Sequence, residues 1–163
     1  MTLQDAPKYQ AAVFFVSDVE KSKHFYNVIL GQKITVDFGA NVGFEGGLSI
    51  WEKNYALKTV FKDKAANFAV GANNAEIYFE ASNLEALFKS LVKQQVNVIH
   101  SIMEHPWGQR AFRIRDPDNH IIEIAEAMGD VVLRLHKEGL SVEGIAEKSM
   151  MPQEFIERVI QGK

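Results

Sequence analysis

The sequence predicts an α+β fold in which two paired βαβββ modules are followed by a C-terminal helical extension. Three observations lead to this prediction. An apolar strand followed by the pattern S-x-x-E occurs twice, at residues 11–20 and 76–85, with a constant offset of 65 residues. Residues 111–126 have the pattern of a hairpin, and the residues that follow have the spacing of short helices. The expected domain covers residues 1–126, with modules at about 9–52 and 76–126, and the extension covers 127–163.

The first module begins with the apolar run AAVFFV at residues 11–16. Ser17 and Glu20 then form the S-x-x-E pattern of a capping box, which starts a helix by accepting N–H groups of its first turn. Gly31 is expected to end this helix. One helix and about four strands are too few to bury both faces of a sheet, so two such units are expected to share a core. The expected elements are a strand at 11–16, a helix at 19–30, and strands at 33–38 and 48–51.

Residues 53–75 separate the two modules and carry several lysines and small residues. This composition predicts a connection with one short helix around residues 56–64. We interpret the segment as a linker, and the alternative is a lid over a ligand cavity.

The second module repeats the first, because EIYFEA at residues 76–81 precedes Ser82 and Glu85. Its last two strands are joined by the turn sequence Asp-Pro-Asp-Asn at 116–119, in which Asn119 tolerates the left-handed conformation that closes such a turn. The expected elements are strands at 76–81, 96–101, 111–115 and 121–126, and a helix at 84–95.

Glu123 lies in the middle of the last expected strand and shares a face with Ile121 and Ala125. A carboxylate among apolar neighbours is costly to bury unless it is paired, bound to a metal or protonated. Glu123 therefore either lines a wet cavity or has a dedicated partner.

The extension is expected to form three short helices, at residues 129–137, 141–148 and 152–160. Residues 139–160 superficially resemble a helix-turn-helix, which makes DNA binding an alternative function. Charge opposes it, because the tail has five basic and six acidic residues, whereas DNA-binding proteins carry a basic stripe. We expect its apolar residues to pack on the modules or on a second subunit; these are Val131, Leu135, Ile145, Phe155, Ile156 and Ile160.

The composition excludes several function classes. The 163 residues are 47% hydrophobic, carry a net charge of −3 and include no cysteine, so disulfides, thiolate catalysis and a general affinity for polyanions are excluded. Residues 1–10 lack the features of a signal peptide, and the run at 11–16 is too short to cross a bilayer. We therefore expect a cytoplasmic protein with no nucleic-acid or membrane partner. The absence of G-x-S-x-G, P-loop and G-x-G-x-x-G motifs sets hydrolase and nucleotide-binding functions aside.

Four short motifs occur in a characteristic order: FY at 25–26, LG at 30–31, PWG at 106–108, and DPD at 116–118 followed by a glutamate. Together they resemble the vicinal oxygen chelate superfamily, which includes glyoxalase I, bleomycin-resistance proteins, fosfomycin-resistance enzymes and extradiol dioxygenases. The resemblance covers about residues 9–126. It implies that the modules form a cupped mixed sheet around a ligand site and that the protein is a homodimer. The PWG-to-DPD segment looks most like bleomycin-resistance proteins, which bind drugs without a metal.

The resemblance also implies where a metal would bind, because metal-dependent members take ligands from the first and last strands of each module. Glu76 and Glu123 match these positions in the second module. The first module offers Ala11, which cannot ligate, and Ile50, or Glu52 if the strand shifts by one pair. Carboxylates without histidine suit weakly held magnesium, calcium or manganese better than zinc or iron. We therefore expect either no cofactor or a weakly bound divalent metal.

Glu76 and Glu123 are also the candidate catalytic acid and base. Two carboxylates that lie close together repel each other, so one of them can have a raised pKa. The alternative is a structural role, in which either carboxylate pairs with an arginine at position 110, 113 or 115.

Aromatic and polar side chains on or beside the expected strands are the candidate ligand-binding residues. A loop tryptophan next to Gly108 suits the covering of a ligand, while Phe112 is assigned to the core. A loop histidine at position 105 polarises a ligand or is simply solvated. The candidates are Trp107, Phe15, Trp51, Tyr78, His105 and Arg113.

Three function hypotheses follow. The first is a metal-independent binder of a small organic molecule, of the bleomycin-resistance kind. The second is an enzyme, with a glyoxalase-like lyase or isomerase or a dioxygenase-like activity, that uses Glu76 and Glu123 with a divalent ion. The third and minor one is a DNA-binding regulator that acts through the C-terminal helices.

Overall fold

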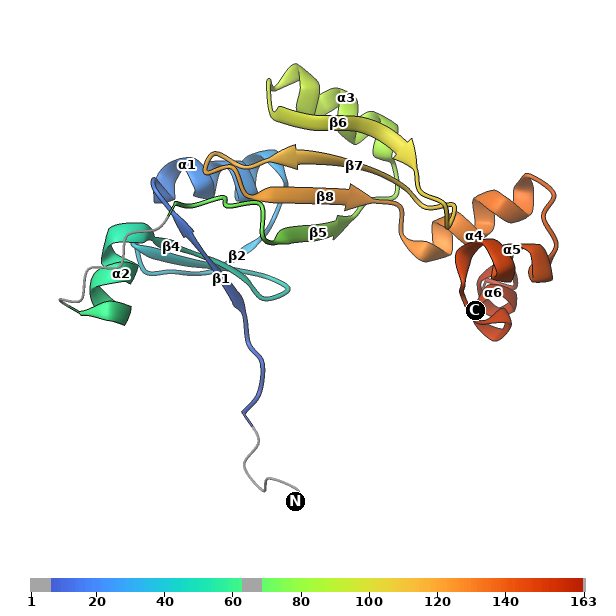
Figure 1. Cartoon of the computed structure of the whole chain (residues 1–163), viewed down its shortest axis with the longest axis horizontal. Coiled ribbons are helices and arrows are strands. Elements are labelled where there is room, and N and C mark those ends of the chain that lie inside the picture. The colour runs from blue at the N-terminus through green and yellow to red at the C-terminus, as the bar shows by residue number, and fades with distance from the viewer. Residues whose placement is uncertain (1–6, 63–68, 163) are drawn as a thin grey trace. The chain divides into compact units, whose positions relative to one another are not determined.

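The computed structural model describes residues 7–62 and 69–162 of the chain, and it contains two four-stranded sheets with helices (Figure 1). The elements are β1 (Ala12–Val16), α1 (Val19–His24), η1 (Phe25–Ile29), β2 (Ile34–Asp37), β3 (Asn41–Phe44), β4 (Leu48–Glu52), α2 (Lys53–Phe61), β5 (Glu76–Glu80), α3 (Leu84–Lys93), β6 (Asn97–Glu104), β7 (Arg110–Arg115), β8 (Ile121–Ala125), α4 (Met128–Lys137), α5 (Val142–Ser149) and α6 (Gln153–Ile160).

The two sheets have the same topology, which confirms the predicted α+β fold of two βαβββ modules with C-terminal helices. The strand orders are β1-β4-β3-β2 and β5-β8-β7-β6. In each sheet the first strand is parallel to the last, and the remaining pairs are antiparallel. A parallel pair needs a long connection, and in each module the helix and two strands supply it. Contacts divide the chain into two compact units, one with residues up to 72 and 117–119, the other with 73–116 and 120 onwards.

The first unit holds β1 to β4, with α1 against β3 and β4. Its core contains apolar side chains from β1, α1, η1, β3 and β4, including Val16, Tyr26, Val42 and Ile50, each of which is fully buried. The expected helix over residues 19–30 is not uniform, because it changes at Phe25 into a π-helical turn that ends with Leu30 N–H donating to the Phe25 carbonyl at 2.9 Å.

The helix caps differ from the prediction by one residue. Asp18, not Ser17, caps α1 by accepting from the backbone N–H of Lys21 at 3.1 Å. In the second module Asn83, not Ser82, caps α3 by accepting from the N–H of Ala86 at 3.0 Å. Ser, Asp and Asn are all good caps, and here two candidates are adjacent in each module. The offset of 65 residues holds for the true caps too, so the repeat is real but lies one residue later.

Two further elements of the first unit differ from expectation. The strand β3 was not assigned a position in the sequence because it lies among glycines, yet its Val42 and Phe44 are buried. A Cβ at Gly43 would lie 2.8 Å from Val36 Cγ1, so the strand needs glycine for close approach to β2. The helix α2 begins at Lys53, three residues earlier than predicted, because the Glu52 side chain caps it. The last two residues of the predicted helix, 63 and 64, lie outside the described residues.

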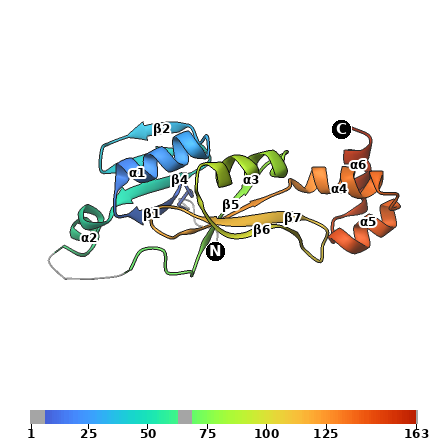
Figure 2. The ribbon, with the colours of Figure 1, turned by 90° about the horizontal axis from the view of Figure 1, so that it is seen from above.

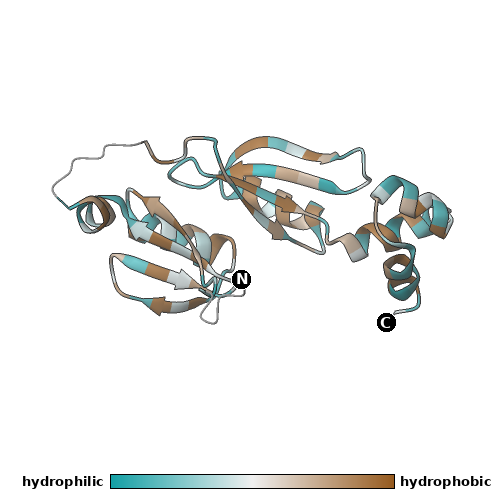
Figure 3. Cartoon of the chain, turned by 60° about the horizontal axis from the view of Figure 1, so that its bottom comes forward, coloured by the Kyte–Doolittle hydropathy of each residue, from teal (hydrophilic) through white to brown (hydrophobic). Residues whose placement is uncertain are grey.

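The second unit holds the sheet β5-β8-β7-β6, and the helix α3 lies along one of its faces (Figure 2). Hydrophobic and hydrophilic residues alternate along these strands (Figure 3). Phe112, Ile114, Ile122 and Ile124 are buried, and the Phe112 ring lies 5.0 Å from that of Phe88 on α3. The intervening residues of the strands therefore point to the opposite face, which α3 does not cover.

The predicted turn between β7 and β8 is confirmed. Asn119 has φ +68°, the left-handed conformation expected of it. Asp116 accepts from the backbone N–H of His120 at 2.8 Å, as expected of an aspartate that begins a turn.

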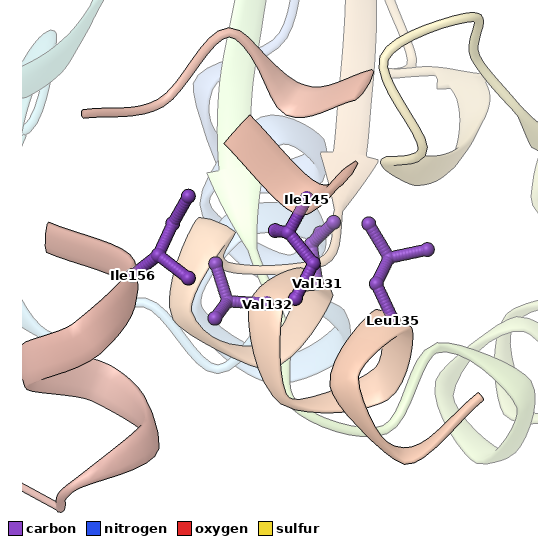
Figure 4. Close-up of a cluster of buried hydrophobic side chains, with 5 residues drawn as sticks. All are labelled: Val131, Val132, Leu135, Ile145 and Ile156. Atoms are coloured by element: carbon purple, nitrogen blue, oxygen red, sulfur yellow. The ribbon is translucent and has the colours of Figure 1, made fainter. Parts of the chain in front are cut away.

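The C-terminal helices α4, α5 and α6 have a hydrophobic core of their own (Figure 4). Val131, Val132 and Leu135 of α4 meet Ile145 of α5 and Ile156 of α6, and all five are fully buried. Phe155 and Ile160 pack against this cluster. These residues therefore pack against one another, and Leu135 also reaches Gly108 of the second module, as predicted; packing of this face on a second subunit stays a prediction. No helix in the described part of the chain is long and apolar enough to cross a membrane.

Candidate functional site

The face of the second sheet that α3 leaves uncovered carries most of the predicted site residues. Tyr78 of β5 and Arg113 of β7 are both register partners of Glu123 on the strand between them. Residues two apart on a strand point to the same face, so Glu76, two residues before Tyr78 on β5, lies on this face too. His100 of β6 is the register partner of Arg113 and extends the row. The hairpin and the parallel β5–β8 pair thus bring these five side chains together.

Arg113 is the cation at the centre of this face. Its Nε donates to Glu76 Oε2 at 2.9 Å, and its Nη2 donates to Glu76 Oε1 at 3.5 Å and to Glu123 Oε2. Its Nη1 lies 3.4 Å from His100 Nε2. The guanidinium thus pairs with both carboxylates, and Arg113 is the dedicated partner of Glu123.

The two carboxylates have different environments. The Glu76 side chain is 40% exposed, and the hydrogen bonds from Arg113 lower the pKa of its carboxyl. The Glu123 side chain is only 8% exposed, and burial raises the pKa of its carboxyl although the positive charge of Arg113 opposes this. Glu76 therefore stays ionised, whereas Glu123 takes up a proton more readily.

A loop between β6 and β7 places two rings beside this row. The His105 imidazole stacks on the Trp107 indole, with ring centroids 4.3 Å apart and planes inclined by 9°. His105 Nε2 lies 3.9 Å from Glu123 Oε1, is buried and has no hydrogen-bond partner among the described residues. Burial, and then the charge of Arg113, lower the pKa of His105, so the ring is neutral at neutral pH. A buried polar atom without a partner is uncommon, so the Nε2 of His105 is a hydrogen-bonding group that the described residues leave unsatisfied.

Gln109 connects the loop to the sheet. Its Oε1 accepts from Trp107 Nε1 at 3.0 Å, and its Nε2 donates to the Tyr78 hydroxyl at 2.9 Å and to the Glu126 carbonyl at 2.7 Å. The Tyr78 hydroxyl in turn donates to Glu80 at 3.1 Å. The rings of Trp107 and Tyr78 are therefore both held in place by hydrogen bonds.

Sequence reasoning missed Gln109 and His100. Gln109 was detectable in principle, because a glutamine that follows a loop tryptophan by two residues and precedes a strand can reach both. His100 was not, because β6 is irregular on either side of it and its facing cannot be counted from the sequence.

The remaining three predicted residues lie in the first unit. Phe15 and Trp51 are register partners on β1 and β4, and their rings meet edge to face at 6.2 Å. Trp51 Nε1 is buried and has no hydrogen-bond partner among the described residues. Glu52 accepts from the N–H groups of Asn54 and Tyr55 at 3.0 and 2.6 Å, which gives its carboxylate a structural role. A role of Phe15 and Trp51 in ligand binding, and of Glu52 in metal binding, stays a prediction.

The donor set does not fit the metal that the superfamily resemblance implies. Arg113 already pairs with both Glu76 and Glu123, so a divalent ion there would meet a fixed positive charge. In the first module Ile50 is fully buried and aliphatic, and Glu52 is engaged as a helix cap. Within residues 7–62 and 69–162, no three histidine, aspartate or glutamate side chains are grouped to hold a metal.

Comparison with known proteins agrees with the fold. The model of the glyoxalase-like domain family matches residues 9–129. A protein of unknown function from Agrobacterium tumefaciens str. C58 is 36% identical, with a TM-score of 0.70 over 76% of this chain and 96% of that one. No curated protein matches the chain.

Two further solved structures are similar in fold. One is a glyoxalase/bleomycin resistance protein/dioxygenase from Nocardioides, with 17% identity and a TM-score of 0.61 over 76% of this chain and 85% of that one. The other is a lactoylglutathione lyase from Agrobacterium tumefaciens, with 16% identity and a TM-score of 0.58 over 76% of this chain and 96% of that one. The chain belongs to the glyoxalase-like domain family, within the vicinal oxygen chelate superfamily.

Proposed function

We propose that the protein binds a small, flat organic molecule on the uncovered face of the sheet β5-β8-β7-β6, without the help of a metal. The observation that carries this proposal is the buried, unpartnered Nε2 of His105, which lies beside the Arg113–Glu123 pair on a ring stacked against Trp107. A ligand that stacks on these rings and bonds to the His105 Nε2 atom needs an aromatic surface and a group that can form a hydrogen bond.

The charges on this face favour a neutral or cationic ligand. Three carboxylates point to it, from Glu76, Glu80 and Glu123, against the two guanidinium groups of Arg113 and Arg115. Tyr78 is 48% exposed and offers a second ring, which is linked to Trp107 through hydrogen bonds to Gln109. Aromatic rings attract cations through their faces, so the acidic balance and the rings act in the same direction.

A metal-independent site is supported by the position of Arg113. A guanidinium is always charged and holds two carboxylates at once, so it supplies the positive charge that a metal would otherwise bring. Binding is therefore expected to survive treatment with EDTA.

An enzymatic function is the second candidate, and one observation favours it. The pKa of Glu76 is lowered and that of Glu123 is raised, and two carboxylates whose pKa values are pushed apart can serve as base and acid. Glu123 would exchange a proton with a bound molecule, and Glu76 would stay ionised beside Arg113. Such a reaction would be an isomerase step, in which Glu123 takes a proton from one atom of the bound molecule and returns it to another, or a lyase step, in which the bond to the leaving group breaks and that group departs with the proton.

The DNA-binding alternative has less support. The exposed residues of α6, the second helix of the helix-turn-helix-like pair, include Gln153, Glu154, Glu157 and Arg158. Two carboxylates on that helix would be repelled by phosphates.

The test is a binding screen with three naphthalene probes of matched size: 1-naphthylmethylamine, 1-naphthol and 1-naphthoate. Binding is followed by the backbone and indole cross-peaks in a ¹H–¹⁵N spectrum of EDTA-treated protein, and the backbone cross-peaks report it in the variant that lacks Trp107. We expect the amine or the alcohol to bind and to shift the Trp107 signal, and Trp107→Ala to weaken this binding about tenfold or more. Binding that requires added Mn²⁺, or that is unchanged in Trp107→Ala, would contradict the proposal.

The homodimer implied by the superfamily resemblance is part of the same proposal. Sedimentation equilibrium is expected to give twice the mass of 18.4 kDa. A monomer at micromolar concentration would remove this part and leave the ligand site untouched.

A further inference from the structure

The C-terminal extension contacts the loop that carries His105 and Trp107. Arg134 of α4 donates from Nη2 to the carbonyl of Gly108, the residue that follows Trp107. Leu135 of α4 and Lys148 of α5 also reach Gly108, since a Cβ placed there would lie 3.2 Å from Leu135 Cδ1 and 3.1 Å from Lys148 Cε. Gly108 has φ +84°, so glycine is needed both for the turn and for this close contact.

The extension is also tied to the strand residues at both ends of this loop. At the start, Glu104 accepts from Lys148 Nζ at 2.7 Å and from Arg134 Nη1 at 3.5 Å. At the end, Arg110 and Arg134 share the buried carboxylate of Glu126. Arg134 donates to it from Nη2 at 2.9 Å and from Nε at 3.2 Å.

Glu126 continues the connection toward the rings. Its backbone carbonyl accepts from Gln109 Nε2 at 2.7 Å, and Gln109 Oε1 accepts from Trp107 Nε1. Inside the loop, the N–H of His105 donates to the Gln109 carbonyl and the N–H of Gly108 donates to the His105 carbonyl, both at 2.8 Å. Arg134 therefore acts at two points of one hydrogen-bonded unit, at the Gly108 carbonyl and at Glu126.

We propose that the C-terminal extension is a positioning element for the ligand site, in which Arg134 holds the 105–109 loop so that His105 and Trp107 stay stacked beside Glu123. The extension can do this because α4, α5 and α6 have their own core and present Arg134 from a rigid helix. The positioning is a property of the ligand-free protein. Its consequence for affinity rests on the proposed function.

The experiment compares Arg134→Gln with a matched control, Arg158→Gln. Arg158 lies in the same extension, on α6, where its guanidinium sits 5.6 Å from the centre of the Phe155 ring. Both variants lose one arginine from the extension, but only Arg134 contacts the loop. Arg134→Lys tests rescue by a cation that keeps the charge but lacks the planar fork, with which Arg134 also reaches the second oxygen of Glu126 and the carboxylate of Glu104.

Two measurements on the ligand-free protein test the positioning. The chain has two tryptophans, and Trp107→Phe identifies the Trp107 indole cross-peak in a ¹H–¹⁵N spectrum. In Arg134→Gln we expect exchange of this indole N–H with water to rise about tenfold or more, because charged hydrogen bonds that hold the loop are lost. We also expect the pH midpoint of this signal, which reports the stacked His105, to move upward as the ring becomes hydrated. For both measurements, Arg134→Lys should give values between those of the wild type and Arg134→Gln, and Arg158→Gln should give the values of the wild type.

An Arg134→Gln variant that is folded by circular dichroism, with unchanged indole exchange and an unchanged midpoint, would overturn the proposal. If this variant does not fold, Lys148→Ala takes its place, since Lys148 contacts Gly108 and Glu104 from a partly exposed position. The affinity for 1-naphthylmethylamine is measured in parallel. If no naphthalene probe binds the wild type while Arg134→Gln still loosens the loop, the proposed function fails and the positioning role stands.

Discussion

Replacement of Arg113 by methionine removes the central charge of the candidate site and leaves two carboxylates without their cation. Truncating one partner of a buried ion pair costs about 3–5 kcal/mol, whereas an exposed pair contributes about 0–1 kcal/mol. Glu123 is nearly buried and Glu76 is well exposed, while Arg113 itself is 24% exposed. The pair with Glu123 therefore dominates, and solvent reduces its effect, so we expect a loss of about 2 kcal/mol of unfolding free energy at pH 7.

The loss should depend on pH with a definite sign. Burial already raises the pKa of Glu123 above its ordinary value of 4.5, and the charge of Arg113 opposes that rise. Without Arg113 the pKa of Glu123 rises further. A carboxyl with a raised pKa in the folded state binds more protons there than in the unfolded state, so the folded state is favoured at low pH and disfavoured as pH rises through the folded value. The stability that Arg113→Met loses relative to the wild type should therefore be largest at pH values above the pKa of Glu123 in the folded variant.

Urea unfolding at pH 5 and pH 8 measures this difference, and Arg115→Met is the matched control. Arg115 lies two residues along β7 and donates to Asn73 at 2.8 Å in an exposed pair. We expect the control to change stability by less than about 0.5 kcal/mol at either pH. The double variant Arg113→Met, Glu123→Gln should recover part of the loss at pH 8. An Arg113→Met variant that is as stable as the control, or that loses the same stability at both pH values, would show that the Arg113–Glu123 pair does not stabilise the fold in this way.

Three further predictions concern other groups. Burial raises the pKa of Glu126, but hydrogen bonds from Arg134 and Arg110 outweigh it and hold this pKa below its ordinary 4.5. The ionised carboxylate therefore stabilises the fold above pH 4.5, and this stabilisation is lost as pH falls through the pKa of the folded state. Glu126→Gln should remove this pH dependence of the unfolding free energy in urea titrations, and a loss of stability at acid pH equal to that of the wild type would contradict the prediction. His105 should titrate below its ordinary 6.5 in NMR, and 1-naphthylmethylamine should bind more weakly once the ring is protonated; a midpoint at or above 6.5 would show that the ring is not buried as described. Ile156→Ala should lower the unfolding free energy by about 3 kcal/mol, because it leaves a cavity between the C-terminal helices. Leu133→Ala, at a side chain that is 48% exposed, should lower it by less than about 1 kcal/mol. Equal losses measured by urea unfolding would mean that the cluster is not a packed core.

The fold followed from the sequence because local signals and tertiary structure agree in this chain. The strand-and-cap pattern of each module, the turn at 116–119 and the alternation along β7 and β8 each depend on neighbouring residues only. The strand β3 escaped because glycines dilute its apolar pattern, although its packing against β2 is what requires Gly43. Adjacent capping residues made the helix starts ambiguous by one position, since either side chain can accept from the first turn.

The candidate site was predictable in part for the same reason. The placement of Glu76, Tyr78, Arg113 and Glu123 on one face depends on strand alternation and hairpin register, which can be counted along the chain. The roles of Gln109 and Arg134 depend on contacts between segments that are far apart, such as the one between Arg134 and Gly108. No spacing rule supplies such contacts. The pairing of Arg113 with both carboxylates was considered only as an alternative, because the sequence does not determine which arginine faces inward most closely.

The most direct test of a metal-free site on this face is chemical-shift mapping of EDTA-treated protein with 1-naphthylmethylamine. We expect the largest changes at the Trp107 indole and at the backbone signals of Tyr78, Arg113 and Glu123, and we expect stoichiometric Mn²⁺ to cause no paramagnetic broadening there. Broadening centred on Glu76 and Glu123 by stoichiometric Mn²⁺, with probe binding that appears only after the metal is added, would show that the site depends on a metal.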